Sequence, residues 1–159
     1  MLPIHQIPLP TPWESLGPVY VYLVRRDPVT LIDTGLATPE SRAALVDGLK
    51  GLGLGLRDIR RVLLTHAHVD HVGLAGWVQD QSGAEVHLHP DEAGKAEIAP
   101  WWQEARDRIL AEAGVDADGF ALIENFWQLN RRMMTPLQEW TPIADGQLFE
   151  FDGGALEAV

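Results

Sequence analysis

The chain has 159 residues, 46% of them hydrophobic, which is enough apolar material for one domain with a core and excludes a disordered protein. Its net charge of −11 argues against a general nucleic-acid surface, and the absence of cysteine excludes disulfides and thiolate metal ligands. Because no apolar run could span a bilayer and the first residues lack the pattern of a secretion signal, we expect a cytoplasmic protein without a membrane partner.

The first part of the chain predicts an extended segment followed by a hairpin. Four prolines within the first twelve residues favour an extended segment over a helix. Residues 19–24 are strongly strand-like, and residues 29–32 return as the second arm of the hairpin. Asp33 ends this arm, at a place where an aspartate can serve simply as a turn residue.

The next segments alternate between helix and strand. Thr38 has the character of an N-cap, and Pro39 then begins a predicted helix that Gly51 ends. Residues 61–65 form a short buried strand rich in branched side chains, and a helix is expected over residues 70–81. This alternation is typical of an α/β fold.

Residues 65–71 hold three histidines and a carboxylate directly after the strand over 61–65. Neutral imidazole and carboxylate are ligands that zinc prefers, and the carboxyl end of a strand is where open α/β sheets keep their ligand sites. His66 and His68 are two residues apart, so in extended backbone they project from the same side and can bind one ion. Asp70 and His71 come as the chain turns into the next helix. The spacing therefore offers two pairs of ligands to two neighbouring metal positions.

Residues 85–89 alternate in polarity and predict another strand, with His87 and His89 on one side. Two histidines at this spacing could also bind a metal. Because Pro90 ends the strand at once, we favour a substrate-side or solvent-exposed position for both.

Residues 91–140 predict helices that are unusually aromatic, with breaks near Gly114 and a cap at Asp116 or Asp118. Two interpretations stay open. Either the aromatic side chains bury one another in a small helical subdomain, or the segment forms a lid over the metal site. Residues 147–159 predict a final hairpin with a glycine turn.

The sequence His-Ala-His-Val-Asp-His at 66–71 resembles the H-x-H-x-D-H signature of the metallo-β-lactamase superfamily. Residues 31–35 and 83–90 add two further matches, and the resemblance resumes more weakly at 145–159. It implies a four-layer αββα sandwich with metals between the two sheets. Over residues 1–159 this chain would supply the first half, a mixed sheet with helices on one face, plus a helical insertion at about 91–140.

The resemblance also implies how the candidate site works. His66 and His68 would bind one metal, Asp70 and His71 a second, and Asp33 would support the metal loop through hydrogen bonds. The remaining ligands would come from a missing C-terminal half, so neither shell is complete and the fragment alone is expected to be inactive. Zn²⁺ is the expected cofactor, with two ions in the intact protein, although the same ligands accept iron or manganese.

The activity implied is that of a glyoxalase II-like hydrolase acting on a small-molecule substrate. A metal-bound hydroxide would cleave a thioester or ester, with Asp70 as the catalytic residue that orients the water. A nuclease of the same fold, an iron-dependent persulfide dioxygenase and a non-catalytic remnant stay open as alternatives. An uncovered apolar sheet face would make the fragment self-associate as a homo-oligomer, or require the partner half.

Overall fold

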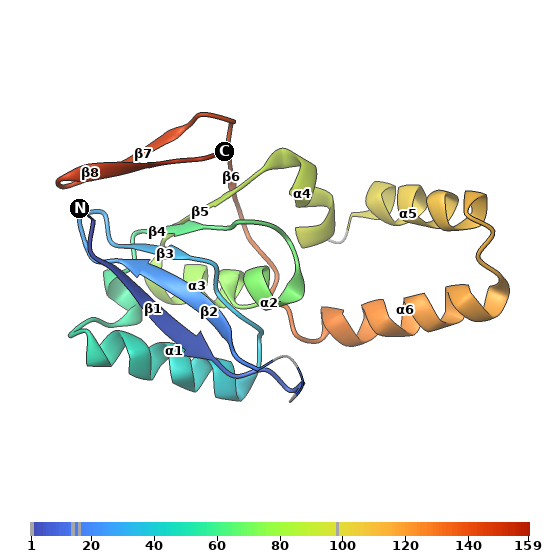
Figure 1. The fold of residues 1–159 in the computed structure, drawn as a ribbon, viewed down its shortest axis with the longest axis horizontal. Coiled ribbons are helices and arrows are strands. Elements are labelled where there is room, and N and C mark those ends of the chain that lie inside the picture. The colour runs from blue at the N-terminus through green and yellow to red at the C-terminus, as the bar shows by residue number, and fades with distance from the viewer. Residues whose placement is uncertain (1, 14, 16, 98) are drawn as a thin grey trace.

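The structure is a computed structural model that describes residues 2–13, 15, 17–97 and 99–159. Its centre is a six-stranded mixed sheet whose spatial order follows the sequence (Figure 1). The strands are β1 (Ile4–Leu9), β2 (Val19–Val24), β3 (Thr30–Ile32), β4 (Arg61–Leu63), β5 (Glu85–Leu88) and β6 (Thr141–Pro142). The first three pair antiparallel, and β3 to β6 pair parallel.

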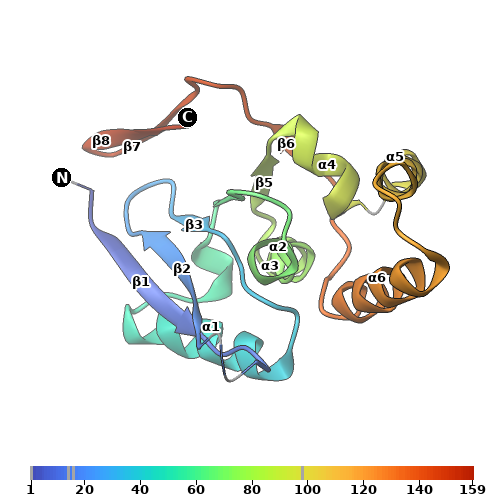
Figure 2. The same cartoon turned by 45° about the vertical axis from the view of Figure 1, so that its right-hand side comes forward.

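Helices and a separate hairpin cover the two faces of this sheet. The helices are α1 (Pro39–Gly51), α2 (Val69–Val72), α3 (Ala75–Ser82), α4 (Pro90–Ala96), α5 (Pro100–Glu112) and α6 (Ala117–Arg131), with a 3₁₀ turn η1 (Leu56–Asp58). α1 and α3 pack on one face, while the hairpin of β7 (Leu148–Phe151) and β8 (Gly154–Glu157) lies over the other (Figures 1 and 2). The expected mixed sheet with helices on one face is confirmed.

The core is divided by the sheet into a large and a small part. The large part lies between the sheet and α1 and α3, and it includes Leu31, Leu45 and Val78. The small part lies under the hairpin, where Leu63 and Phe149 pack together. The strand over 61–63 is therefore covered on both of its faces, which explains its nearly continuous apolar sequence.

Two expected elements differ from the prediction. The extended first segment is a true strand, β1, paired with β2 from Ile4↔Val24 to Leu9↔Val19; its proline at position 8 is tolerated because β1 is an edge strand. The single helix expected over 70–81 is broken into α2 and α3. At the break, the carbonyl of Gly73 accepts hydrogen bonds from the backbone N–H of Thr135 at 2.7 Å and from the Thr135 hydroxyl at 2.8 Å. The carbonyl is therefore paired with a segment distant in the sequence.

The helix boundaries otherwise follow their caps. The Thr38 hydroxyl accepts a hydrogen bond from the Ser41 N–H at 3.1 Å, and the Asp116 carboxylate accepts one from the Gly119 N–H at 2.9 Å. Gly83 ends α3 with a φ of 71°, a conformation that glycine adopts without strain. These local signals explain why the helix ends were visible in the sequence.

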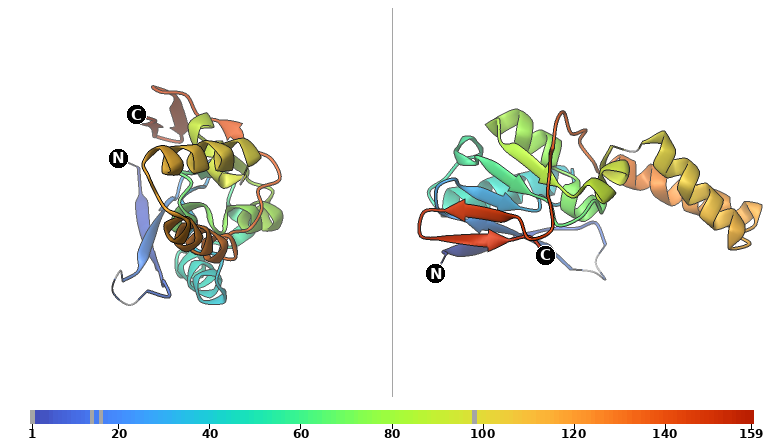
Figure 3. Two further views of the ribbon diagram at one scale, coloured as in Figure 1. Left: turned by 90° about the vertical axis from the view of Figure 1, so that its right-hand side faces the viewer. Right: turned by 90° about the horizontal axis from the view of Figure 1, so that it is seen from above.

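α5 and α6 project beyond the sheet (Figure 3). Their aromatic side chains are only partly buried: Trp101 is 57% exposed and Phe126 is 59% exposed. Trp102 and Trp127 pack edge to face, with ring centres 4.8 Å apart. The segment therefore buries only some of its aromatic side chains against one another. Among the described residues, no helix combines the length and apolarity needed to cross a bilayer.

Gly76→Ala should destabilise the fold. A Cβ at Gly76 would lie 2.7 Å from the carbonyl carbon of Pro136 and closer still to its carbonyl oxygen, so the segment after Thr135 would have to move. We expect a loss of about 1–3 kcal/mol in the free energy of unfolding, measured by urea denaturation.

Gly51→Ala is the matched control for that measurement. No atom lies within 4 Å of the Cβ that this substitution adds at the end of α1. Its stability should be unchanged or slightly increased, since alanine favours helix over glycine. Equal losses in the two variants would contradict the close packing described at Gly76.

Candidate metal centre

The candidate site lies at the carboxyl end of the parallel strands. The loop over 64–68 leaves β4, which pairs in parallel with β3 on one side and β5 on the other. Asp33 directly follows β3, and His89 directly follows β5. Three neighbouring strands thus deliver polar side chains to one edge of the sheet, where α/β folds form ligand sites.

The structure brings the four predicted ligands together as two pairs. The Nε2 atom of His66 lies 2.8 Å from Nδ1 of His68, and Nε2 of His71 lies 3.5 Å from Oδ2 of Asp70. The rings of His66 and His71 are 4.1 Å apart between centres, so the pairs are neighbours. Among the described residues, no three His, Cys, Asp or Glu side chains are arranged to hold one metal ion together.

Asp33 lies under the ligand loop and contacts it at three points. Its carboxylate, 4% exposed, accepts a hydrogen bond from the Thr65 N–H at 2.9 Å and lies 2.8 Å from the Thr65 hydroxyl. The Nδ1 atom of His71 lies 2.8 Å from the same carboxylate. Because a carboxylate only accepts, His71 carries its proton on Nδ1, and in the neutral ring Nε2 keeps its lone pair on the side of Asp70.

The surroundings move the pKa values of two histidines in opposite directions. The hydrogen bond from His71 to Asp33 raises the pKa of His71, while partial burial opposes this. Partial burial lowers the pKa of His66, and the neighbouring His71 and His68 lower it further. His66 is therefore held in the neutral form, which is the form that binds a metal.

This donor set fits zinc. Two nitrogens bound to one tetrahedral zinc, each at about 2.0–2.1 Å from the metal, lie about 3.3 Å apart. The facing nitrogens of His66 and His68 come close to that spacing, so a small rotation of either ring would admit the ion between them. Each pair supplies two ligands, so a tetrahedral shell at either position needs further donors.

The structure adds three supporting residues that the sequence analysis missed. Glu92 accepts a hydrogen bond from the Ala67 N–H at 2.8 Å, and Lys95 donates to the same carboxylate. Burial would raise the pKa of Glu92, but these hydrogen bonds lower it. Thr34 donates through its hydroxyl to the His71 carbonyl at 2.8 Å. The sequence shows Glu92 as an acidic residue in the first turn after Pro90. It gives no sign that Glu92 binds the backbone N–H of Ala67, which lies 25 residues earlier.

A substrate-side or solvent-exposed position was predicted for both His87 and His89, and only His89 has one. His87 is 6% exposed, and its ring packs edge to face on Phe149 at 5.3 Å, so it belongs to the core. The prediction of a substrate-side or solvent-exposed His87 is wrong because the β7–β8 hairpin covers that side of β5. His89 accepts a hydrogen bond from the Asp91 N–H at 3.3 Å and lies at the edge of a cavity.

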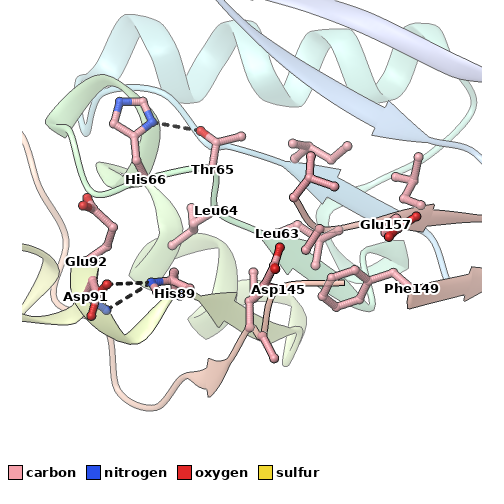
Figure 4. Close-up of a pocket in the computed structure, with 16 residues that line it drawn as sticks. Leu63, Leu64, Thr65, His66, His89, Asp91, Glu92, Asp145, Phe149 and Glu157 are labelled. Carbon is pink, nitrogen blue, oxygen red and sulfur yellow. Dashed lines mark hydrogen bonds and ion pairs between the residues drawn. The ribbon is translucent and has the colours of Figure 1, made fainter. Parts of the chain in front are cut away.

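Two cavities meet at the ligand loop. A cavity of about 660 Å³ lies between the loop, the start of α4 and the hairpin, with His66, Glu92, His89 and Phe149 among its lining residues (Figure 4). A second cavity, of about 480 Å³, is lined by His68 and Asp70 together with residues of α6. His66, His68 and Asp70 therefore each line a cavity, whereas His71 lines neither of the two.

Histidine titration by NMR should separate His66 from His71. We expect the pKa of His71 above about 6.5 and that of His66 below it, since 6.5 is the ordinary value for histidine. Asp33→Asn should lower the pKa of His71, because it removes the charged acceptor. Asp47→Asn, on exposed α1 surface, is the control and should leave His71 unchanged.

The same ion pair should make stability depend on pH. The pKa of His71 is raised in the folded chain, so its contribution is fully present below about pH 6.5 and is lost as the pH rises through the folded value. Urea unfolding of the wild-type chain and of Asp33→Asn, at several pH values, measures this difference. A gap between the two that stays constant with pH would contradict a charged His71–Asp33 pair.

Comparison with known sequences finds a family and relatives that match this chain. The family model described as "Metallo-beta-lactamase superfamily" matches residues 15–154. The Probable metallo-hydrolase YqjP of Bacillus subtilis (strain 168) is 37% identical over 114 residues, covering 70% of this chain and 35% of the relative. The Uncharacterized protein YobT of the same organism is 42% identical over 62 residues, covering 38% of this chain and 24% of that protein.

Solved structures show the same fold. The metallo-beta-lactamase family protein TTHA1429 from Thermus thermophilus matches with a TM-score of 0.78 and 31% identity, covering 97% of this chain and 50% of that one. A Beta-lactamase domain protein from Burkholderia ambifaria matches with a TM-score of 0.69 at 19% identity, covering 97% of this chain and 46% of that one. The chain therefore spans about half the length of these solved relatives and about a third of YqjP.

Proposed function

The chain belongs to the metallo-beta-lactamase superfamily, and on this basis we propose that it carries part of the active site of a metal-dependent hydrolase. His66 and His68 are its ligands for one ion, and Asp70 and His71 are its ligands for a second. The arrangement of these four side chains in two facing pairs, above the buried Asp33, is the observation that carries the proposal.

Zinc is the proposed metal because histidine nitrogens and a carboxylate form the donor set, although iron and manganese accept the same ligands. When bound, the metal supplies a Lewis acid and lowers the pKa of its water to about 7. His66 Nε2 and His68 Nδ1 face each other at 2.8 Å, and both would turn a lone pair to the ion when it binds. Asp33 fixes the ring of His71 through Nδ1, so that Nε2 stays directed toward the site.

Asp70 is the proposed catalytic residue. Its carboxylate is partly exposed, and it lies beside Nε2 of His71 at the edge of the smaller cavity. A carboxylate at this position can accept a hydrogen bond from the attacking water and orient it toward a carbonyl carbon. Neither a serine nor a cysteine nucleophile is required.

The proposed substrate is a thioester or ester of a small molecule. The cavities beside the ligand loop have the size of small-ligand sites, and the net charge of −11 disfavours a nuclease. Because this chain offers only two ligands for each metal and spans half of its solved relatives, we propose that hydrolysis also needs donors from outside residues 1–159.

Metal titration of residues 1–159 tests the ligand assignment. Zinc should bind weakly, since each pair supplies only two of the four ligands of a tetrahedral site. His68→Ala should weaken binding about tenfold or more, measured by calorimetry. His5→Ala, on edge strand β1, is the matched histidine control and should bind like the wild-type chain. Equal affinity in both variants would exclude His68 as a ligand.

Activity is tested on the full-length gene product reconstituted with zinc. A panel of thioester, ester, RNA and persulfide substrates separates the proposed hydrolase from the alternatives. We expect hydrolysis of a thioester or ester, and Asp70→Asn should lower kcat by about 100-fold or more. Oxygen consumption with a persulfide in the iron-loaded protein, without ester or thioester cleavage, would replace the proposal by a dioxygenase.

A further inference from the structure

The smaller cavity at the ligand loop has aromatic walls, and we call it the aromatic pocket. It has a volume of about 480 Å³, within the range of about 300–1,000 Å³ that is usual for small-ligand sites. Its lining includes Trp13 from the segment before β2, His68 from the ligand loop, Asp70 from α2, and Phe126, Trp127 and Asn130 from α6. Metal ligands and aromatic rings thus face the same space.

The aromatic wall is held at a fixed place relative to the ligands. The segment after α6 is bound to the helix pair that follows the ligand loop, because Thr135 donates two hydrogen bonds to the Gly73 carbonyl. The Thr135 hydroxyl also accepts from the Trp77 N–H at 3.0 Å, and the Met133 carbonyl accepts from the Ala37 N–H at 2.9 Å. The end of α6 is therefore anchored beside Asp70.

The chemistry of the pocket favours a neutral and apolar occupant. Among the described residues, the lining includes no lysine or arginine, while Asp70 contributes a carboxylate. Asp70 is one of the proposed metal ligands, so the rest of the wall, formed by Trp13 and α6, is what meets the remainder of a substrate, and its described residues offer no cation to an anionic group. Trp127, Phe126 and Trp13 offer flat apolar surfaces, and Asn130, which is buried, adds an amide.

We propose that the aromatic pocket binds a neutral apolar group of the substrate, an aromatic ring or an acyl chain attached next to the bond that is cleaved. This inference rests on the proposed function, since the neighbouring His68 and Asp70 are what make the occupant part of a substrate. Phe126 determines the preference for such a group, because it is half-exposed and free to contact a ligand at the pocket.

Binding is tested first on the metal-free chain, in the presence of EDTA, with 2-naphthylacetamide as the probe. The indole N–H signals of Trp13 and Trp127 should shift on titration in ¹H–¹⁵N NMR spectra. The signal of Trp101, which is exposed on α5 and does not line the pocket, should stay in place. Acetamide, which has the same polar group without the ring, should shift none of them.

Two alanine substitutions on α6 give the matched comparison. Phe126→Ala removes a ring from the pocket and should weaken binding of 2-naphthylacetamide about tenfold. Leu122→Ala removes an apolar side chain that is 72% exposed, one turn earlier on the same helix and outside the pocket, and it should leave binding unchanged. Unshifted indole signals, or equal effects of the two substitutions, would overturn the inference. Concentration-dependent shifts of Trp13 and Trp127 without any probe would also overturn it, because a second copy would then occupy the pocket.

Kinetics on the zinc-loaded full-length protein separate this inference from the proposed function. Phe126→Ala should raise KM about tenfold for a 2-naphthylacetyl thioester and leave KM for the acetyl thioester unchanged. Hydrolysis of both thioesters with unchanged KM values would reject the pocket and keep the hydrolase. Probe binding without hydrolysis of any ester or thioester would reject the hydrolase and keep the pocket as a binding site.

Discussion

The buried carboxylate of Asp33 is the constraint on which the candidate site depends. A carboxylate removed from water is stable only when its oxygens are hydrogen-bonded, and here Thr65 and His71 provide these bonds. The three residues belong to the end of β3, the end of β4 and helix α2. Satisfying one buried group therefore fixes the two ends of the ligand loop, and Glu92 fixes its middle through the Ala67 N–H.

Much of the fold could be predicted from the sequence because its signals are local. The cap at Thr38, the stop at Gly83 and the apolar runs of the inner strands each act within a few residues. The break between α2 and α3 could not be predicted, since it follows from Thr135, 62 residues after Gly73. The pairing of β1 likewise depends on a partner strand rather than on its own proline-rich sequence.

In the candidate site too, local features could be predicted from the sequence, and features that depend on distant residues could not. Its four proposed ligands lie within six consecutive residues, so their spacing alone predicted two pairs, and the structure places the pairs side by side. The burial of His87 was hidden because Phe149, which covers it, lies far along the chain. For α6, which forms a wall of the aromatic pocket, the sequence predicted only a helix rich in aromatic residues. Nothing in that sequence distinguishes a buried helix from a lid over the site.

The anchors of the helical segment lie at its two ends, away from the turn between α5 and α6. Thr135 holds one end against Gly73, and Trp101 packs on Gly94 at the other, whereas Gly114 at the turn has open space around it. Insertions and deletions at this turn therefore change no contact that positions a proposed metal ligand. The chain can therefore change length at this turn and leave the edge of the sheet that carries the histidines as it is.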